Sequence, residues 1–147
     1  MRFTMSISGR DEVNANLANF LRNFQAASAR ALYRRMEAVM ARSKRQFVPV
    51  DLGPLKDSGY VSFPERRGDT LSCTASYGGA AAAYALAVHE HPSSYSPFSW
   101  RRAEALGHGV HFSPAGTGPK YLEKPLMQWA QTAAVDLAND IKQETGL

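Results

Sequence analysis

The stretch that decides the fold is Arg10 to Phe47, which reads RDEVNANLANFLRNFQAASARALYRRMEAVMARSKRQF. It contains no Gly or Pro and is rich in residues that favour helix, and Asp11 and Glu12 lie where a helix start favours negative charge. The pattern predicts helix. Because a single helix of this length exceeds the usual range in globular proteins, we expect a short helix, a break within Asn23 to Ser28, and then a long basic helix.

Two apolar stripes run along this stretch at the spacings of three and four that mark the buried face of a helix. The first stripe comprises Val13, Leu17, Phe20, Leu21 and Phe24, and the second comprises Leu32, Met36, Val39 and Phe47. Both are expected to pack on a core.

A small antiparallel sheet is predicted on either side of the helical stretch. Met1 to Ser8 alternates apolar and polar residues, as a half-buried strand does. After a Pro- and Gly-containing connector at Val48 to Ser58, a strand from Tyr60 to Phe63, a turn at Pro64 to Asp69 and a strand from Thr70 to Tyr77 form a predicted hairpin.

The remainder of the chain is predicted to be helix, loop and helix. Tyr84 to His89 favours a short helix, and Glu90 to Gly118 is a loop much longer than the usual connection, expected to be mobile until a partner orders it. A final helix starts at Pro119 and ends at Gly146. The predicted fold is therefore α+β, a single domain over residues 1–147 in which the hairpin and N-terminal strand pack against a long N-terminal helix and a C-terminal helix.

The composition limits the classes of function. The chain has 147 residues, of which 44% are hydrophobic and 20% are charged, which is typical of one globular domain. No apolar run approaches the ~18 residues that cross a bilayer, and no secretory signal is recognised, so we expect no membrane contact and a protein that stays in the cytoplasm where it is made. The single cysteine, Cys73, has no partner for an internal disulfide.

The charge is distributed unevenly along the chain, although the net value is only +4. Between Arg22 and Arg45 every charged residue is basic except Glu37. By contrast, Asp136, Asp140 and Glu144 make the last helix acidic. Such polarity suits the packing of subunits against one another, and also suits loose contact with phosphates.

No pattern predicts catalysis. His89, His91, His108 and His111 gather with Glu90, but their spacing matches no metal-binding motif, so a metal-dependent hydrolase stays an alternative and the predicted protein has no catalytic residue, metal or cofactor. Another alternative is a nucleic-acid-binding module that uses the basic helix over residues 30–45, although that helix has no recognition-helix pair and no aromatic stacking platform among its arginines.

The connector carries a motif. Pro49-Val50-Asp51-Leu52-Gly53-Pro54-Leu55-Lys56-Asp57-Ser58 resembles the PVDTGxLxxS signature of the tail-completion, or neck, family of long-tailed bacteriophages, in which Leu52 stands where Thr is usual. The order of the parts is also similar: a basic helical half, the motif, a hairpin, a YAxxVE-like segment beginning at Tyr84, and a KYLxxAL-like segment beginning at Lys120. The motif residues that carry the resemblance are Pro49, Val50, Asp51, Gly53, Leu55 and Ser58.

The resemblance implies a structural virion protein of the phage neck, a minor capsid or head–tail connector subunit without catalysis or cofactor. Its expected partners are further copies of itself in a six-fold or twelve-fold ring, the tail terminator or tail tube, and the head-closure or portal-side connector proteins, with transient proximity to packaged DNA. Particles would be assembled in the host cytoplasm. The residues expected to meet neighbours are Arg30, Arg34, Arg35, Arg42, Arg45, Tyr84, Glu90, Lys120, Tyr121, Asp136, Asp140 and Glu144.

Overall fold

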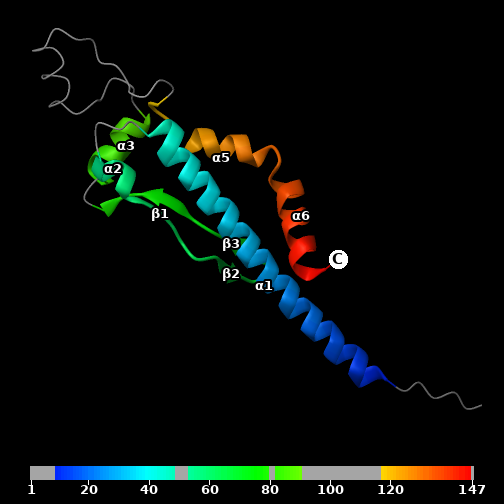
Figure 1. Ribbon diagram of the computed structural model, residues 1–147. Helices are drawn as coiled ribbons and strands as arrows, with labels where there is room; N and C mark the ends of the chain where they lie inside the picture. The colour runs from blue at the N-terminus through cyan, green and yellow to red at the C-terminus, as the bar shows by residue number, and fades with distance from the viewer. Residues whose placement is uncertain (1–8, 49–52, 80–81, 91–116, 147) are drawn as a thin grey trace, which may run out of the picture.

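The computed structural model describes residues 9–48, 53–79, 82–90 and 117–146 and has the predicted α+β fold. A long helix, α1 (Arg10–Arg42), forms its spine, and its C-terminal half is flanked by a hairpin on one side and by two C-terminal helices on the other (Figure 1). The N-terminal half of α1 projects beyond the other described elements (Figure 1). The predicted N-terminal strand, Met1 to Ser8, lies outside the described residues.

The predicted break in the first helix is wrong, since α1 runs without interruption through Asn23 to Ser28. Ser28 does not end the helix because its hydroxyl donates to the carbonyl of Phe24 one turn back, at 2.8 Å. The neighbouring alanines favour helix, and Ala27 is buried, so tertiary packing holds the region in helical form.

The last turn of the long helical stretch is widened into a π-helix, η1 (Ser43–Phe47). The amide of Val48 donates to the carbonyl of Ser43 at 3.0 Å, a bond that spans five residues instead of four. Val48 itself is extended, so the helical stretch ends at Phe47 as the sequence predicts.

The predicted hairpin is confirmed in two paired segments that follow a short helix, α2 (Gly53–Asp57). Strand β1 (Gly59–Val61) pairs antiparallel with β4 (Ala75–Tyr77), and β2 (Glu65–Arg67) pairs antiparallel with β3 (Thr70–Ser72). The predicted turn over residues 64–69 was too long, because only Gly68 and Asp69 turn and the preceding three residues form β2. Gly68 adopts a φ of +60°, which a two-residue hairpin turn requires.

The C-terminal half of the described chain is helical. Helix α3 (Ala82–Glu90) confirms the short helix predicted there. The final helix was predicted as one piece from Pro119, but it begins later and consists of α5 (Glu123–Ala130) and α6 (Ala133–Thr145). At the break, the amide of Thr132 donates to the carbonyl of Trp129 at 2.9 Å, which closes a tight turn, and the Thr132 hydroxyl donates to the carboxylate of Asp136 at 2.8 Å in the first turn of α6.

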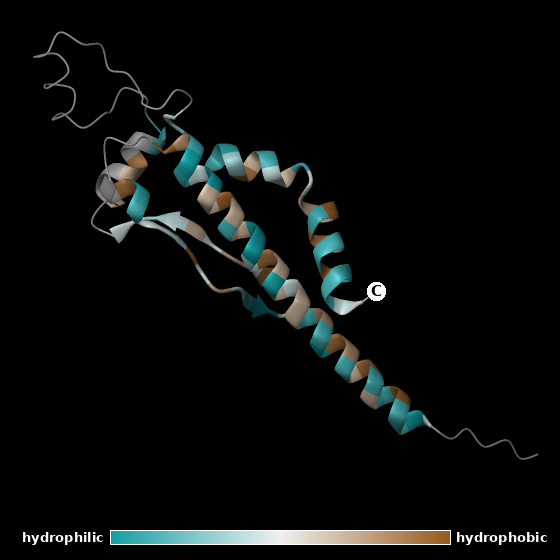
Figure 2. Ribbon diagram, viewed as in Figure 1, coloured by the Kyte–Doolittle hydropathy of each residue, from teal (hydrophilic) through white to brown (hydrophobic). Residues whose placement is uncertain are grey.

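The core lies where α1, the hairpin and the C-terminal segments meet. One buried cluster consists of Val48, Leu55, Ala85 and Tyr121, and a second consists of Met36, Met40 and Val61. Both contact residues of the C-terminal half of α1 or of η1 and α2, and neither includes the projecting half of α1. Figure 2 shows that apolar residues nevertheless recur along that projecting half.

Candidate interaction surfaces

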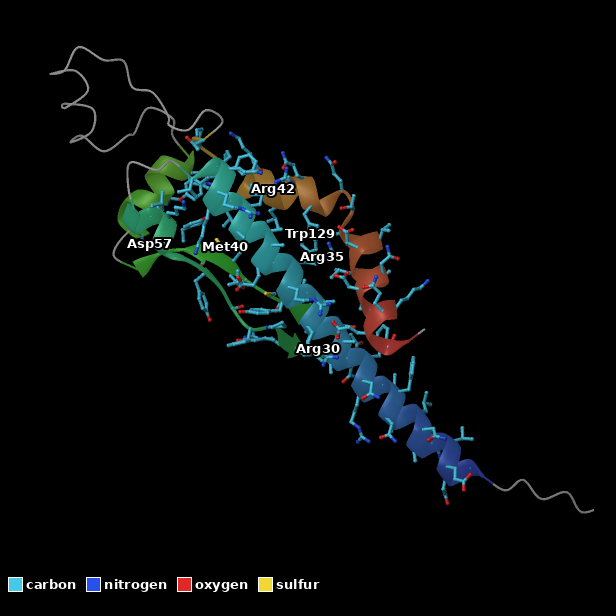
Figure 3. The ribbon with its side chains drawn as sticks, in the orientation of Figure 1. Arg30, Arg35, Met40, Arg42, Asp57 and Trp129 are labelled. Atoms are coloured by element: carbon cyan, nitrogen blue, oxygen red, sulfur yellow. The ribbon has the colours of Figure 1, made fainter. Side chains whose placement is uncertain are left out.

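The most extensive polar contact joins α1 to α6. Arg35 donates two hydrogen bonds of 2.6 Å to the two carboxylate oxygens of Asp140, a bidentate arrangement that fixes both side chains. One turn farther along, Arg30 and Arg34 both reach Glu144, at 2.7 and 2.5 Å. The spacing of four residues places Arg30 and Arg34 on one face of α1, and Asp140 and Glu144 on one face of α6. Figure 3 shows Arg30 and Arg35 on α1 beside α6.

These ion pairs change the interpretation of the uneven charge. The sequence suggested that a basic helix on one subunit meets an acidic helix on the next, but the structure pairs the two helices within one chain. Asp136 also takes part, 3.9 Å from Arg35. Six of the interface candidates therefore have partners within the chain and hold α6 on α1: Arg30, Arg34, Arg35, Asp136, Asp140 and Glu144. Of the other arginines expected there, Arg42 donates to Gln46 at 3.0 Å and Arg45 is exposed.

The α1–α6 contact makes the fold sensitive to acid. The pKa values of Asp140 and Glu144 are held below the ordinary range chiefly because Arg35 and Arg30, respectively, hydrogen-bond the carboxylates. In the unfolded chain such groups titrate near pH 4. The pairs therefore stabilise the fold fully above about pH 5, and this contribution is lost as the pH falls through the lower folded-state pKa values.

We expect the melting temperature to fall between about pH 5 and pH 3, and to fall less steeply in Arg35→Gln, which has already lost the pair. At neutral pH that variant should be destabilised by about 1 kcal/mol or less, since the pair is partly exposed. Arg42→Gln is the matched control, because Arg42 bonds Gln46 and not a carboxylate. Thermal melts across this pH range measure both effects, and an identical acid profile in wild type and Arg35→Gln would contradict the assignment.

A second site surrounds Tyr121, which the sequence placed on a surface. The structure corrects that prediction: the side chain is only 2% exposed, and its hydroxyl donates to the carbonyl of Ala85 at 2.8 Å. Tyr77 and His89 both meet its ring edge-on, with ring centroids 5.0 Å away. The KYL-like segment thus acts as an anchor that ties the start of the C-terminal half to α3 and the hairpin.

A buried serine completes this anchor. The Ser43 hydroxyl is fully buried in the first turn of η1, 2.8 Å from the Tyr77 hydroxyl and 2.7 Å from the backbone carbonyl of Tyr121. Burial raises the pKa of Tyr77 to about 12, so its hydroxyl stays protonated at physiological pH. Through Ser43, η1 is therefore hydrogen-bonded both to β4 and to the segment that contains Tyr121.

An open cavity of about 380 Å³ lies beside this anchor. Its rim includes Leu86 and the polar residues His89 and Glu90. The Glu90 carboxylate already has two partners: Lys120 Nζ lies 2.7 Å from it and His89 Nδ1 lies 2.8 Å from it. The hydrogen bond from Lys120 is the main reason that the pKa of Glu90 is lowered. The two interface candidates Glu90 and Lys120 therefore pair with each other across the start of the C-terminal half.

The motif residues fall partly within the structure. Leu55 is fully buried, and Ser58 donates from its hydroxyl to the Leu55 carbonyl at 2.8 Å, so both serve the local fold. Gly53 begins α2. Pro49, Val50 and Asp51 lie outside the described residues, as do His91, His108 and His111, and Tyr84 lies in α3. Within the described ranges, no three His, Cys, Asp or Glu side chains are grouped to hold a metal ion.

The first apolar stripe is exposed, contrary to the prediction from the sequence. Val13, Leu17, Phe20, Leu21 and Phe24 were expected to pack on the core, yet they are 65, 54, 43, 47 and 38% exposed. Nothing in the sequence distinguishes a stripe that the chain covers from one that it leaves uncovered. In the part of the chain that the structure describes, this stripe is the largest run of exposed apolar side chains on one element.

No helix among the described residues is both long enough and apolar enough to span a membrane. Comparison of the chain with protein-family models, with curated proteins and with solved structures gave no match.

Proposed function

We propose that this protein is a structural subunit of the neck of a tailed bacteriophage, where copies of it assemble into a ring that joins the head connector to the tail. The order of the motifs from the connector to the KYL-like segment supports the proposal. The observation that carries it is the shape of the subunit: a small core attached to a helix whose projecting half exposes five large apolar side chains. Contiguous exposed apolar patches mark interaction sites with other proteins.

The internal contacts are consistent with a building block. Ion pairs hold α6 to α1, and the buried Ser43–Tyr77–Tyr121 contacts hold the hairpin and the C-terminal half to the same helix. The projecting half of α1 extends from this braced body without a covering element among the described residues (Figure 1). A core held together by these contacts, with a helix that projects from it, fits assembly better than catalysis. Catalysis needs convergent polar groups in a cleft.

The nucleic-acid alternative draws less support from the structure. Three arginines of the basic helix, Arg30, Arg34 and Arg35, face carboxylates, and Lys44 donates to the carbonyl of Gly59 at 2.7 Å. These cations are already paired, so fewer are available to replace the counterions of a phosphate backbone.

The proposal is tested in a phage that encodes the chain. A nonsense mutation in its gene should yield filled heads and finished tails that do not join, and supplying the wild-type chain in trans should restore infectious particles. Electron microscopy of purified virions should show copies of the chain around the axis between head and tail. Joined, infectious particles formed without the polypeptide would overturn the proposal.

A further inference from the structure

The spacing within the exposed stripe is symmetric. Val13, Leu17, Phe20 and Phe24 are separated by four, three and four residues, and on a helix with 3.6 residues per turn they lie within about 60° of one another. This is the a/d spacing of a coiled-coil seam. Because four, three, four reads the same in either direction, the seam of one helix matches that of an identical helix that runs the opposite way.

We propose that two copies of this chain pair through the projecting halves of α1, antiparallel and about a two-fold axis. In this register Val13 lies opposite the partner's Phe24, and Leu17 lies opposite the partner's Phe20, so that each layer combines an aliphatic side chain with an aromatic ring. The proposal concerns the free chain before assembly and does not rest on the proposed function. A two-fold contact closes on itself, so entry into a ring would require the stripe to exchange this partner for a neighbour in the ring.

The charges of this segment permit self-pairing. Along the seam the flanking positions hold Asn14, Asn16, Leu21 and Asn23, none of which is charged. Asp11 and Arg22 lie on the opposite side of the helix, and Glu12 lies away from the seam. Flanking positions usually carry the charges that select or reject partners, and uncharged flanks bring no like charges together when the partner is identical.

The ends of the seam also fit. Farther along α1 the same stripe continues as Ala27 and Ala31, which are 1% and 0% exposed. In the proposed register Arg10 falls opposite the partner's Ala27. That position adjoins the C-terminal end of α6, because Glu144 of α6 contacts Arg30 of α1. Because Ala27 is already buried within its own chain, the seam ends at this level and Arg10 lies at its end.

The size of the contact sets its strength. The ten large apolar side chains of two copies would remove on the order of 1,000 Å² from water, close to the ~1,200 Å² at which specific interfaces begin. Helices of about 15 residues are marginal alone in water, so the projecting segment gains most of its stability from being covered. We therefore expect a dimer that dissociates at micromolar concentration.

Sedimentation equilibrium of the intact protein from about 1 to 100 μM covers the range in which such a dimer dissociates. Wild type should be dimeric at the upper end, and Leu17→Glu should weaken association by at least about 100-fold, because it places a charge in the seam of both copies. Ala15→Glu is the matched control, since it adds the same charge on the opposite face of the helix and should leave association unchanged. Both variants should keep the wild-type circular dichroism spectrum.

The direction of pairing is tested by cross-linking in a Cys73→Ser background. Leu17→Cys and Phe20→Cys should each fail to form a disulfide dimer alone and should form one when mixed, because an antiparallel pair places position 17 beside position 20 of the partner. Cross-linking of either variant with itself would indicate parallel helices and overturn the proposal. So would a monomer at all concentrations, which would assign the stripe to a different protein or to residues of this chain outside those described. A monomeric wild type would leave the neck proposal standing, since that is decided in virions.

Discussion

Leu55→Ala is expected to lower the free energy of unfolding by about 2–5 kcal/mol. The side chain is fully buried and packs in one cluster with Val48, Ala85 and Tyr121, which come from three other segments of the chain. Removing three carbons there loses apolar burial and leaves a cavity that these segments fill only in part. Urea denaturation followed by circular dichroism measures the change, with the midpoint and slope analysed together.

Leu86→Ala provides the control for this substitution. Leu86 is 68% exposed on α3, so the same chemical change should alter the free energy of unfolding by about 0.5 kcal/mol or less. Equal destabilisation by the two variants would show that the motif does not anchor the core. Within this chain, Leu55 fills the core and the Ser58 hydroxyl holds the turn that follows it by donating to the Leu55 carbonyl.

Local features of the fold were predictable because their causes are local. The absence of Gly and Pro from Arg10 to Phe47 predicts the helical stretch, and Gly68 marks the tight turn of the hairpin. The two errors in helix continuity have tertiary or single-residue causes. Asn23 to Ser28 stays helical within α1, whereas a tight turn closed by the bond from the Thr132 amide to the Trp129 carbonyl interrupts a sequence with continuous apolar periodicity.

The contacts that define the interaction surfaces were not predictable from local sequence. Arg30 and Glu144 are 114 positions apart, and only the folding of α6 along α1 brings them together. The sequence shows that α1 is basic and α6 is acidic. Only the fold shows that these two helices pair within one chain and not between neighbouring subunits. The two apolar stripes of α1 look equivalent in sequence, but only the second packs against the hairpin and α5, whereas the first is exposed.

Gly59→Ala is expected to destabilise the protein by about 1–3 kcal/mol, the usual cost of overpacking. A Cβ atom at this position would meet Lys44 Cε, and would lie 2.8 Å from both Met40 Sδ and Tyr77 Cε1. Lys44 can move, but its ammonium donates to the Gly59 carbonyl at 2.7 Å, and Met40 belongs to the core.

Gly78→Ala is the matched control for Gly59, because a Cβ atom there meets nothing within 4 Å and its backbone does not have a positive φ. That variant should be neutral or slightly stabilised through a less flexible unfolded chain. Urea denaturation of both variants tests the claim. If Gly59→Ala matched Gly78→Ala, the close approach of β1 to α1 would be refuted, because the absence of a side chain at position 59 is what lets the hairpin lie directly on the spine.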